Sequence, residues 1–321
     1  MNLKCASFFA GVGGIDKGFE LAGYETVFAN EFDEKAAVTY KSNFPQAEFL
    51  LKDIREVDEK KLPDFDILLA GFPCQAFSLA GYRQGFNDEK GRGNLFFELV
   101  RIVKEKQPKV IFLENVKNLV THDEGNTFKV IYDTLESLGY YIKWHVLNAS
   151  NYGNVPHSRE RIYIVCFKDK EEYKNFEWPK PIKLEKTLSD VIDFETPQAD
   201  KYYYTEECYF YPHLIENAVD SDTCYQWRRV YVRENKSKLC PTLTANMGMG
   251  GHNVPIIRMY NGQFRKLTPR ECFNLQGFPA DYNLPEELKD SALYKQAGNS
   301  VVVTVIQRIA EEISNAIKNR A

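Results

Sequence analysis

The sequence predicts a doubly wound α/β domain built on a mostly parallel sheet, with a second, smaller domain of irregular structure. Short apolar runs alternate with amphipathic segments over the first 167 residues, as they do in βαβ units. A glycine-rich turn directly follows the first apolar run, at the edge where such sheets bind ligands. Near Trp178-Pro179-Lys180-Pro181 the alternation stops, and the chain to about Tyr260 has no long periodic helix.

The expected elements of the first domain follow one another in a regular order. The predicted strands are Leu3–Phe9, Thr26–Glu31, Glu48–Lys52, Asp66–Ala70, Lys109–Glu114, Ile142–Leu147 and Arg161–Phe167. The predicted helices are Gly14–Leu21, Asp33–Ser42, Asn94–Lys106 and Asn126–Leu138. Gln107 precedes a proline and therefore ends the third helix. The amphipathic segment Val301–Ile317 is predicted to return and pack on this domain.

Length and composition are those of a globular protein with a large and a small domain. The chain has 321 residues, of which 44% are hydrophobic and 27% are charged. Its seven cysteines are odd in number and show no CxxC spacing, which argues against a disulfide framework and a zinc site. No apolar run reaches membrane-spanning length, and the run Cys5–Ala10 is too short for a signal peptide. A reducing cytoplasm is the predicted location.

Charge is unevenly distributed although the net charge is only −4. Between Cys224 and Glu271 the chain has nine Lys and Arg against two acidic residues, whereas Glu171–Thr223 has five Lys against thirteen Asp and Glu. Such a basic block can be a solvated face balanced by its neighbour. It is equally the pattern of a phosphate-binding surface confined to one module.

The turn after the first strand indicates a cofactor site. In SFFAGVGGIDKGFELAG, Gly11, Gly13 and Gly14 lead from a strand into a helix whose N–H groups can face a ligand. Glu31 ends the next strand, where a carboxylate can accept from ribose hydroxyls, so a nucleoside-containing cofactor is predicted. The pattern is not a complete GxGxxG, which disfavours NAD. Asp53 follows the third strand and either contacts an adenine amino group or caps its own loop.

A cysteine and an acid are predicted to lie at matching ends of two strands of the same sheet, at the edge used for ligands. In AGFPCQAFS, Gly71 and Pro73 end a buried strand just before Cys74, and FLENVKN places Glu114 at the end of another strand. A thiolate can attack an electron-poor ring while a neighbouring acid protonates that ring. A lone cysteine here could instead be a small hydrophobe at a strand end. SRERIYIV adds two alternate arginines before a further strand, which could lie near an anion or on an exposed edge.

These motifs resemble those of the bacterial DNA (cytosine-5)-methyltransferases of restriction–modification systems. FFAGVGG, GFPCQAFS, ENVKN, RERIY, RKLTPREC with QGFP, and YKQAGNSV occur in that family's order and with similar spacing. The resemblance covers nearly the whole chain. The exception is about Lys183 to Met259, which in that family is the variable region that recognises the target. Two positions depart from the family pattern, since His157 stands where Gln is usual and Asn274 where Arg is usual.

The resemblance implies a fold, a cofactor and a set of site residues. It implies a Rossmann-like catalytic domain over residues 1–182 and 291–321, a target-recognition domain over 183–262 and a hinge over 263–290. S-adenosylmethionine is the implied cofactor, S-adenosylhomocysteine the product, and no metal is implied. The implied cofactor residues are Phe9, Gly11, Gly13, Gly14, Glu31, Phe32, Asp53, Ile54, Pro73 and Asn299.

The same resemblance implies the catalytic and DNA-binding residues. Cys74 is the implied nucleophile, Glu114 the group that hydrogen-bonds and protonates the cytosine ring, and Arg159 and Arg161 supports of the substrate. The loop from Gln75 to Gly93 is expected to close over DNA. The implied DNA contacts are Gln75, Ser78, Arg228, Arg229, Arg233 and Thr242.

The expected function is therefore methylation of cytosine C5 in a short duplex DNA sequence through a flipped base. The resemblance also implies a monomer that is paired with a restriction endonuclease without forming a stable complex with it, and the variable segment suggests a GCNGC-type palindrome. Three alternatives are a transfer RNA methyltransferase of the same fold, a catalytically inactive DNA-binding relative, and a nicotinamide dehydrogenase. The basic block favours duplex DNA over transfer RNA, and the presence of both Cys74 and Glu114 disfavours the inactive relative.

Overall fold

The chain forms two compact units. The computed structural model describes residues 3–73, 95–249 and 255–318. One unit contains Met1–Leu147, Glu160–Pro179 and Ile306–Ala321, and the other contains Asn148–Arg159 and Lys180–Val305. Within the described ranges, no helix is long and apolar enough to cross a membrane.

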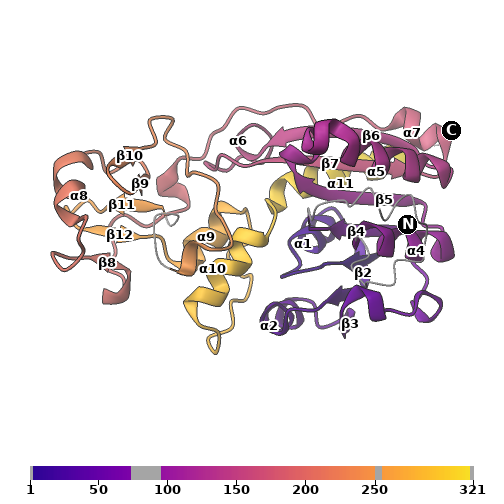
Figure 1. Cartoon of the computed structure of the whole chain (residues 1–321), viewed down its shortest axis with the longest axis horizontal. Helices are drawn as coiled ribbons and strands as arrows, with labels where there is room; N and C mark the ends of the chain where they lie inside the picture. Colours follow the sequence, from indigo (N-terminus) through magenta and orange to yellow (C-terminus); the bar gives the residue numbers. More distant parts are fainter. Residues whose placement is uncertain (1–2, 74–94, 250–254, 319–321) are drawn as a thin grey trace. The chain divides into compact units, whose positions relative to one another are not determined.

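The first unit is built on a seven-stranded sheet (Figure 1). Its strands are β1 Lys4–Phe8, β2 Glu25–Glu31, β3 Glu48–Leu51, β4 Ile67–Gly71, β5 Val110–Val116, β6 Tyr141–Asn148 and β7 Glu160–Phe167. They lie in the order β3-β2-β1-β4-β5-β7-β6, in which the pairs from β3 to β5 are parallel and β7 is antiparallel to β5. These pairs confirm the predicted mostly parallel sheet. Its central strands are buried on both faces, which is why they appear in the sequence as continuous apolar runs.

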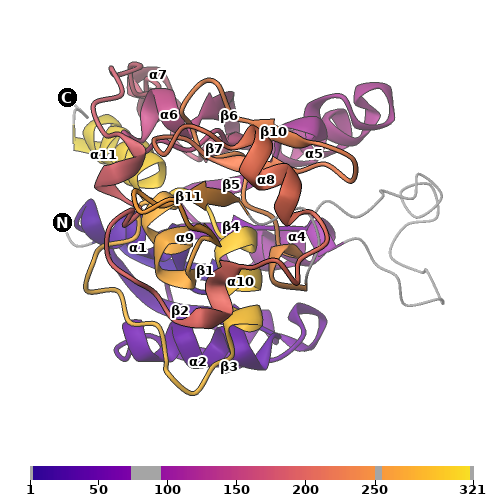
Figure 2. The same cartoon turned by 90° about the vertical axis from the view of Figure 1, so that its left-hand side faces the viewer.

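Helices cover both faces of this sheet, as the prediction of a doubly wound fold requires. They are α1 Gly14–Leu21, α2 Glu34–Asn43, α4 Leu95–Lys106, α5 Asn126–Ser137, α7 Lys170–Asn175 and α11 Val303–Lys318. In Figure 2, α4 and α5 lie on one side of the sheet and α1 and α11 on the other. Phe19 of α1 packs against Phe112 of β5 with ring centroids 5.2 Å apart. On the other face of the sheet, Phe8 of β1 and Leu113 of β5 pack in one cluster with residues of α4 and α5.

The C-terminal helix packs on the first unit, as its amphipathic pattern predicts. A Cβ placed on Gly18 of α1 would lie 2.5 Å from Cβ of Ile306, so the two helices touch through a glycine. The Tyr24 hydroxyl donates to the carbonyl of Ala310 at 3.0 Å. Burial of the apolar stripe of α11 therefore ties the end of the chain to its beginning.

The second unit contains a five-stranded sheet and is more regular than the sequence indicates. Its strands are β8 Tyr203–Tyr204, β9 Tyr225–Trp227, β10 Val232–Glu234, β11 Ile256–Arg258 and β12 Phe264–Lys266, in the antiparallel order β10-β9-β11-β12-β8. Its helices are α6 Ala149–Tyr152, α8 Tyr211–Asn217, α9 Pro269–Leu275 and α10 Asp290–Asn299. Strands of two or three residues are too short for an alternating pattern to be recognised in sequence.

One member of the basic block is part of the core of this unit. Arg265 is fully buried, and its Nη2 lies 2.6 Å from Oε1 of Glu271. Glu271 also accepts from Thr268 in a capping box at the start of α9. Removing either partner of such a buried pair would leave an uncompensated charge, so the pair is structural and adds nothing to the surface charge of the block.

Candidate active site

The glycine turn after β1 combines left-handed backbone with close packing. Phe9, Gly11 and Gly13 have φ of 54°, 55° and 76°. A Cβ on Gly13 would lie 2.3 Å from Cε2 of Phe44, so that position has no room for a side chain. A Cβ on Gly11 would meet nothing within 4 Å. The turn is thus held on one side by α2 and open beside Gly11, before Gly14 begins α1.

Glu31 connects the end of β2 to this turn. Its Oε2 accepts from the amide of Gly11 at 2.8 Å, and its Oε1 accepts from the amides of Phe32 and Asp33 at 2.9 Å. A carboxylate oxygen has two lone pairs, so the buried Glu31 can accept a further hydrogen bond through Oε2. Phe32, the next residue, is 69% exposed. Together they place an acceptor and an aromatic face beside an open stretch of backbone.

Asp16 is a buried acid behind the turn whose role sequence reasoning missed. Its Oδ2 accepts from the Ser7 hydroxyl and its Oδ1 from the Tyr40 hydroxyl, both at 2.8 Å. Burial raises the pKa of Asp16 to about 6, although these hydrogen bonds oppose the rise. The group ties together β1, α1 and α2. The available signal was an acid in the first turn of an amphipathic helix, directly after Ile15.

Asp53 caps its own loop in this structure. Its Oδ1 accepts from the amide of Arg55 at 2.9 Å, and its Oδ2 lies 2.6 Å from Nη2 of the same residue. The hydrogen bond from the Arg55 side chain lowers the pKa of Asp53. Of the two roles predicted for Asp53, capping is observed, and contact with an adenine amino group stays a prediction. Ile54, which follows it, is buried.

Glu114 stands beside the strand end that leads to the predicted nucleophile. In the parallel pair of β4 and β5, Glu114 is the partner of Gly71, and a Cβ on Gly71 would lie 3.4 Å from Oε2 of Glu114. Nε of Arg161 is 3.1 Å from Oε1 of Glu114, and both side chains are mostly buried. Asn115 donates to the carbonyl of Phe72 at 2.8 Å. The chain leaving β4 is therefore held next to the carboxylate.

The predicted nucleophile and the loop expected to close over DNA come directly after β4 in the sequence. Pro73 is described and exposed. Cys74, Gln75 and Ser78, with the rest of the loop to Gly93, lie outside the described residues.

Three further predicted site residues belong to the second unit. Arg159 is buried, with its guanidinium donating to backbone carbonyls. Asn299 is an exposed residue at the end of α10. Thr242 is exposed, and its hydroxyl donates to the carbonyl of Ser158 at 2.6 Å. His157, which departs from the family pattern, is buried and accepts from the amide of Leu243 at 3.3 Å.

The predicted DNA-binding arginines lie on the hairpin of β9 and β10. Arg228 donates to the Gln226 side chain at 2.8 Å and is partly buried. Arg229 is exposed in the turn with φ of 67°, and Arg233 is exposed on β10 opposite Gln226. The hairpin thus presents two exposed guanidinium groups, which is the chemistry suited to phosphates and guanine edges.

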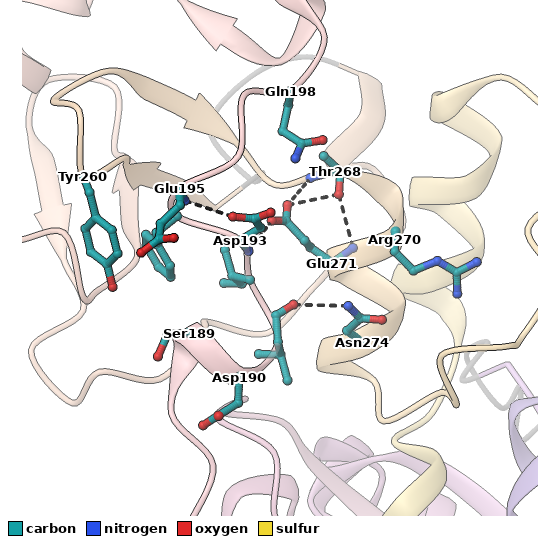
Figure 3. Close-up of a pocket in the computed structure, with 13 residues that line it drawn as sticks. Ser189, Asp190, Asp193, Glu195, Gln198, Tyr260, Thr268, Arg270, Glu271 and Asn274 are labelled. Carbon is teal, nitrogen blue, oxygen red and sulfur yellow. Dashed lines mark hydrogen bonds between the residues drawn. The ribbon is translucent and has the colours of Figure 1, made fainter.

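A separate hollow of about 550 Å³ lies wholly within the second unit (Figure 3). Its lining includes the carboxylates of Asp190, Asp193 and Glu195, together with Asn274, the second departure from the family pattern. Asn274 donates to the carbonyl of Val191 at 3.3 Å. Of the residues predicted to bind cofactor or DNA, none that the structure describes lines this hollow. Within the described ranges, no group of three or more His, Cys, Asp or Glu could hold a metal ion.

Comparisons with known proteins agree with one another. The model of the family "C-5 cytosine-specific DNA methylase" matches residues 3–315. The type II methyltransferase M.Bsp6I of Bacillus sp. (strain RFL6) is 61% identical over 313 residues, which are 97% of this chain and 98% of that protein. M.HhaI of Haemophilus parahaemolyticus is 39% identical over 98% of this chain and 95% of its own length. A DNMT2 variant of Spodoptera frugiperda has the same fold, with a TM-score of 0.73 at 21% identity over 97% of this chain and 99% of its own.

Proposed function

This chain belongs to the C-5 cytosine-specific DNA methylase family and is a DNA methyltransferase, and we propose that it transfers the methyl group of S-adenosylmethionine to C5 of a cytosine in one short duplex sequence. The observation that carries the proposal is the position of Glu114. Its carboxylate is mostly buried, paired with Arg161, and adjacent to the strand end from which the chain reaches Cys74 three residues later.

The first unit has residues that fit S-adenosylmethionine. The open backbone beside Gly11 leaves room for a ligand, Glu31 retains acceptor capacity for a ribose hydroxyl, and the exposed ring of Phe32 can stack on a base. When bound, S-adenosylmethionine supplies an electrophilic methyl group and becomes S-adenosylhomocysteine. The further residues we propose around it are Phe9, Gly13, Gly14, Asp53, Ile54, Pro73 and Asn299.

The proposed chemistry uses Cys74 as the nucleophile. Its thiolate adds to C6 of the cytosine, and the electron pair of the C5–C6 double bond shifts to C5 and is delocalised through C4 to N3, which makes C5 nucleophilic. Glu114 stabilises this charge by hydrogen-bonding to the ring and protonating it, while Arg161 holds the carboxylate in place. After methylation, water takes the C5 proton, and the electron pair left behind restores the C5–C6 double bond. The C6–sulfur bond breaks with its electron pair remaining on sulfur, and the ring returns its proton to Glu114. Cys74 thereby returns to its starting state.

The target cytosine must leave the duplex to reach such a site, because its C6 is not accessible within the base stack. We propose that the exposed Arg229 and Arg233 hold DNA phosphates or read base edges, with Arg228, Thr242, Gln75 and Ser78 as additional contacts. M.Bsp6I is named as a type II methyltransferase, and its similarity supports a role in a restriction–modification system. In that role the enzyme would act as a monomer and protect DNA without a stable complex with the endonuclease.

Bisulfite sequencing of plasmid DNA from cells that express the chain tests the proposal. We expect unconverted cytosines confined to one short repeated motif, which the variable segment suggests is of the GCNGC type. Cys74→Ala serves as the control and should leave all cytosines convertible. Full conversion with the unaltered chain, combined with methylation of transfer RNA in the same cells, would contradict the proposed substrate. Methylation by Cys74→Ala at the rate of the unaltered chain would contradict the proposed nucleophile.

A further inference from the structure

Three segments that are far apart in the sequence meet around the Arg159 side chain in the second unit. Arg159 is only 3% exposed. Its Nη1 donates to the carbonyl of Leu243 at 3.0 Å, and its Nη2 donates to the carbonyls of Gly298 at 3.1 Å and Ser300 at 2.5 Å. A guanidinium can bridge acceptors on different sides because its N–H groups point in fixed directions.

Backbone hydrogen bonds join the first two of these segments directly. The amide of Cys240 donates to the carbonyl of Pro156 at 2.7 Å, and the amide of Ser158 donates to the carbonyl of Cys240 at 2.9 Å. The Thr242 hydroxyl adds its bond to the carbonyl of Ser158. Residues 156–159 and 240–243 therefore run beside each other as a short paired stretch, with Arg159 at its end.

The third segment is in direct backbone contact with the second. A Cβ on Gly298 would lie 2.2 Å from the carbonyl carbon of Thr244 and 2.4 Å from the nitrogen of Ala245. Any side chain at Gly298 would push these two segments apart. The Arg159 guanidinium bridges the same two segments, because Nη1 donates to the carbonyl of Leu243 and Nη2 to the carbonyl of Gly298.

We call the meeting point of residues 156–159, 240–245 and 298–300 the Arg159 joint. It contains two residues of the proposed function. Asn299, proposed to contact the cofactor, lies between the two residues whose carbonyls accept from Nη2 of Arg159. Thr242, proposed to contact DNA, precedes the residue whose carbonyl accepts from Nη1. We propose, on the basis of that function, that Arg159 is a positioning residue that holds Thr242 and Asn299 in one fixed arrangement. It does not contact the substrate base, because reaching a ligand would require a buried cation to leave three charge-assisted hydrogen bonds.

Hydrogen exchange of the unliganded protein tests this role independently of activity. In Arg159→Gln, amide exchange in residues 240–245 and 296–300 should accelerate together by about tenfold or more, while exchange in β4 and β5 should be unchanged. Arg159→Lys retains the charge but has one nitrogen, so it should give an intermediate acceleration. Arg161→Gln is the matched control, and it should leave both segments protected.

Steady-state kinetics provides the second readout. For Arg159→Gln, the KM values for DNA and for S-adenosylmethionine should each rise about tenfold, while kcat stays within about threefold. For Arg161→Gln, kcat should fall while both KM values stay nearly unchanged. If Arg159→Gln does not fold, Gly298→Ala separates the same segments without removing a charge, and it should give the same paired changes.

Either of two results would overturn the assignment. One is unchanged amide exchange in residues 240–245 and 296–300 of a folded Arg159→Gln or Gly298→Ala variant. The other is a kcat that falls a hundredfold while both KM values stay the same, which would place Arg159 on the base. Absence of methylation by the unaltered protein would count against the proposed function, and the exchange results would still decide whether Arg159 holds the joint.

Discussion

The buried carboxyl of Asp16 should make the protein less stable as the pH rises from 4 to 7. The side chain is fully buried behind the glycine turn, where the hydroxyls of Ser7 and Tyr40 donate to it. Burial raises its pKa from the ordinary value of 3.8 to about 6. Replacement by Asn keeps the shape and the ability to hydrogen-bond, but it removes the ionisation.

The magnitude follows from the shift of the Asp16 pKa. A change of about two pKa units, at 1.36 kcal/mol per unit, corresponds to on the order of 3 kcal/mol. The folded state binds the proton more tightly than the unfolded state does. The stabilisation is therefore complete below the unfolded pKa and is lost as the pH rises through the folded value of about 6. The free energy of unfolding of Asp16→Asn, relative to the unaltered chain, should rise by most of that amount between pH 4 and pH 7.

Urea unfolding at a series of pH values measures this difference. Asp53→Asn is a control of opposite sign, because the hydrogen bond from Arg55 lowers the pKa of Asp53. That carboxylate stabilises the fold above its unfolded pKa, and its contribution is lost as the pH falls. A difference between Asp16→Asn and the unaltered chain that stays constant from pH 4 to pH 7 would refute the argument.

Three further outcomes can be measured. Gly13→Ala should lower the free energy of unfolding by about 2–4 kcal/mol, because its Cβ would overlap Phe44 in addition to straining a left-handed backbone. Gly11→Ala has open space around its Cβ and should lower the free energy of unfolding by only about 1 kcal/mol. Equal losses in the two variants would contradict the packing argument. Asn274→Arg brings a cation into the hollow lined by Asp190, Asp193 and Glu195 and should raise Tm by about 1–3 °C. A lower Tm would contradict this electrostatic argument. Glu114→Gln should lower kcat by about 10²–10⁴ while the Kd for S-adenosylmethionine, measured by titration calorimetry, is unchanged; a kcat within threefold of the unaltered enzyme would remove Glu114 from catalysis.

The sequence determined the elements of the first unit because their signals are local. A strand of a parallel sheet is a short apolar run, and a helix on its face repeats every 3.6 residues, so both can be recognised without knowledge of the partner. The ends of β4 and β5 were predictable for the same reason. The sequence placed both strand ends at the ligand-binding edge of one sheet, and the pairing of β4 with β5, which puts Glu114 opposite Gly71, came from the structure.

Tertiary structure alone decided which charged groups are buried and what holds them. The sequence shows Arg159 and Arg161 as equivalent alternate arginines, yet the first is enclosed by carbonyls 84 to 141 positions away and the second is paired with Glu114. Arg265 reads as part of a basic surface and is in fact in the core.

The physical reason is that periodicity depends on near neighbours, whereas burial, hydrogen-bond partners and pKa depend on segments brought together by folding. Asp16 illustrates this difference. Its place in the first turn of α1 could be read from the sequence, but its raised pKa arises from the enclosure that Tyr40 and the sheet provide.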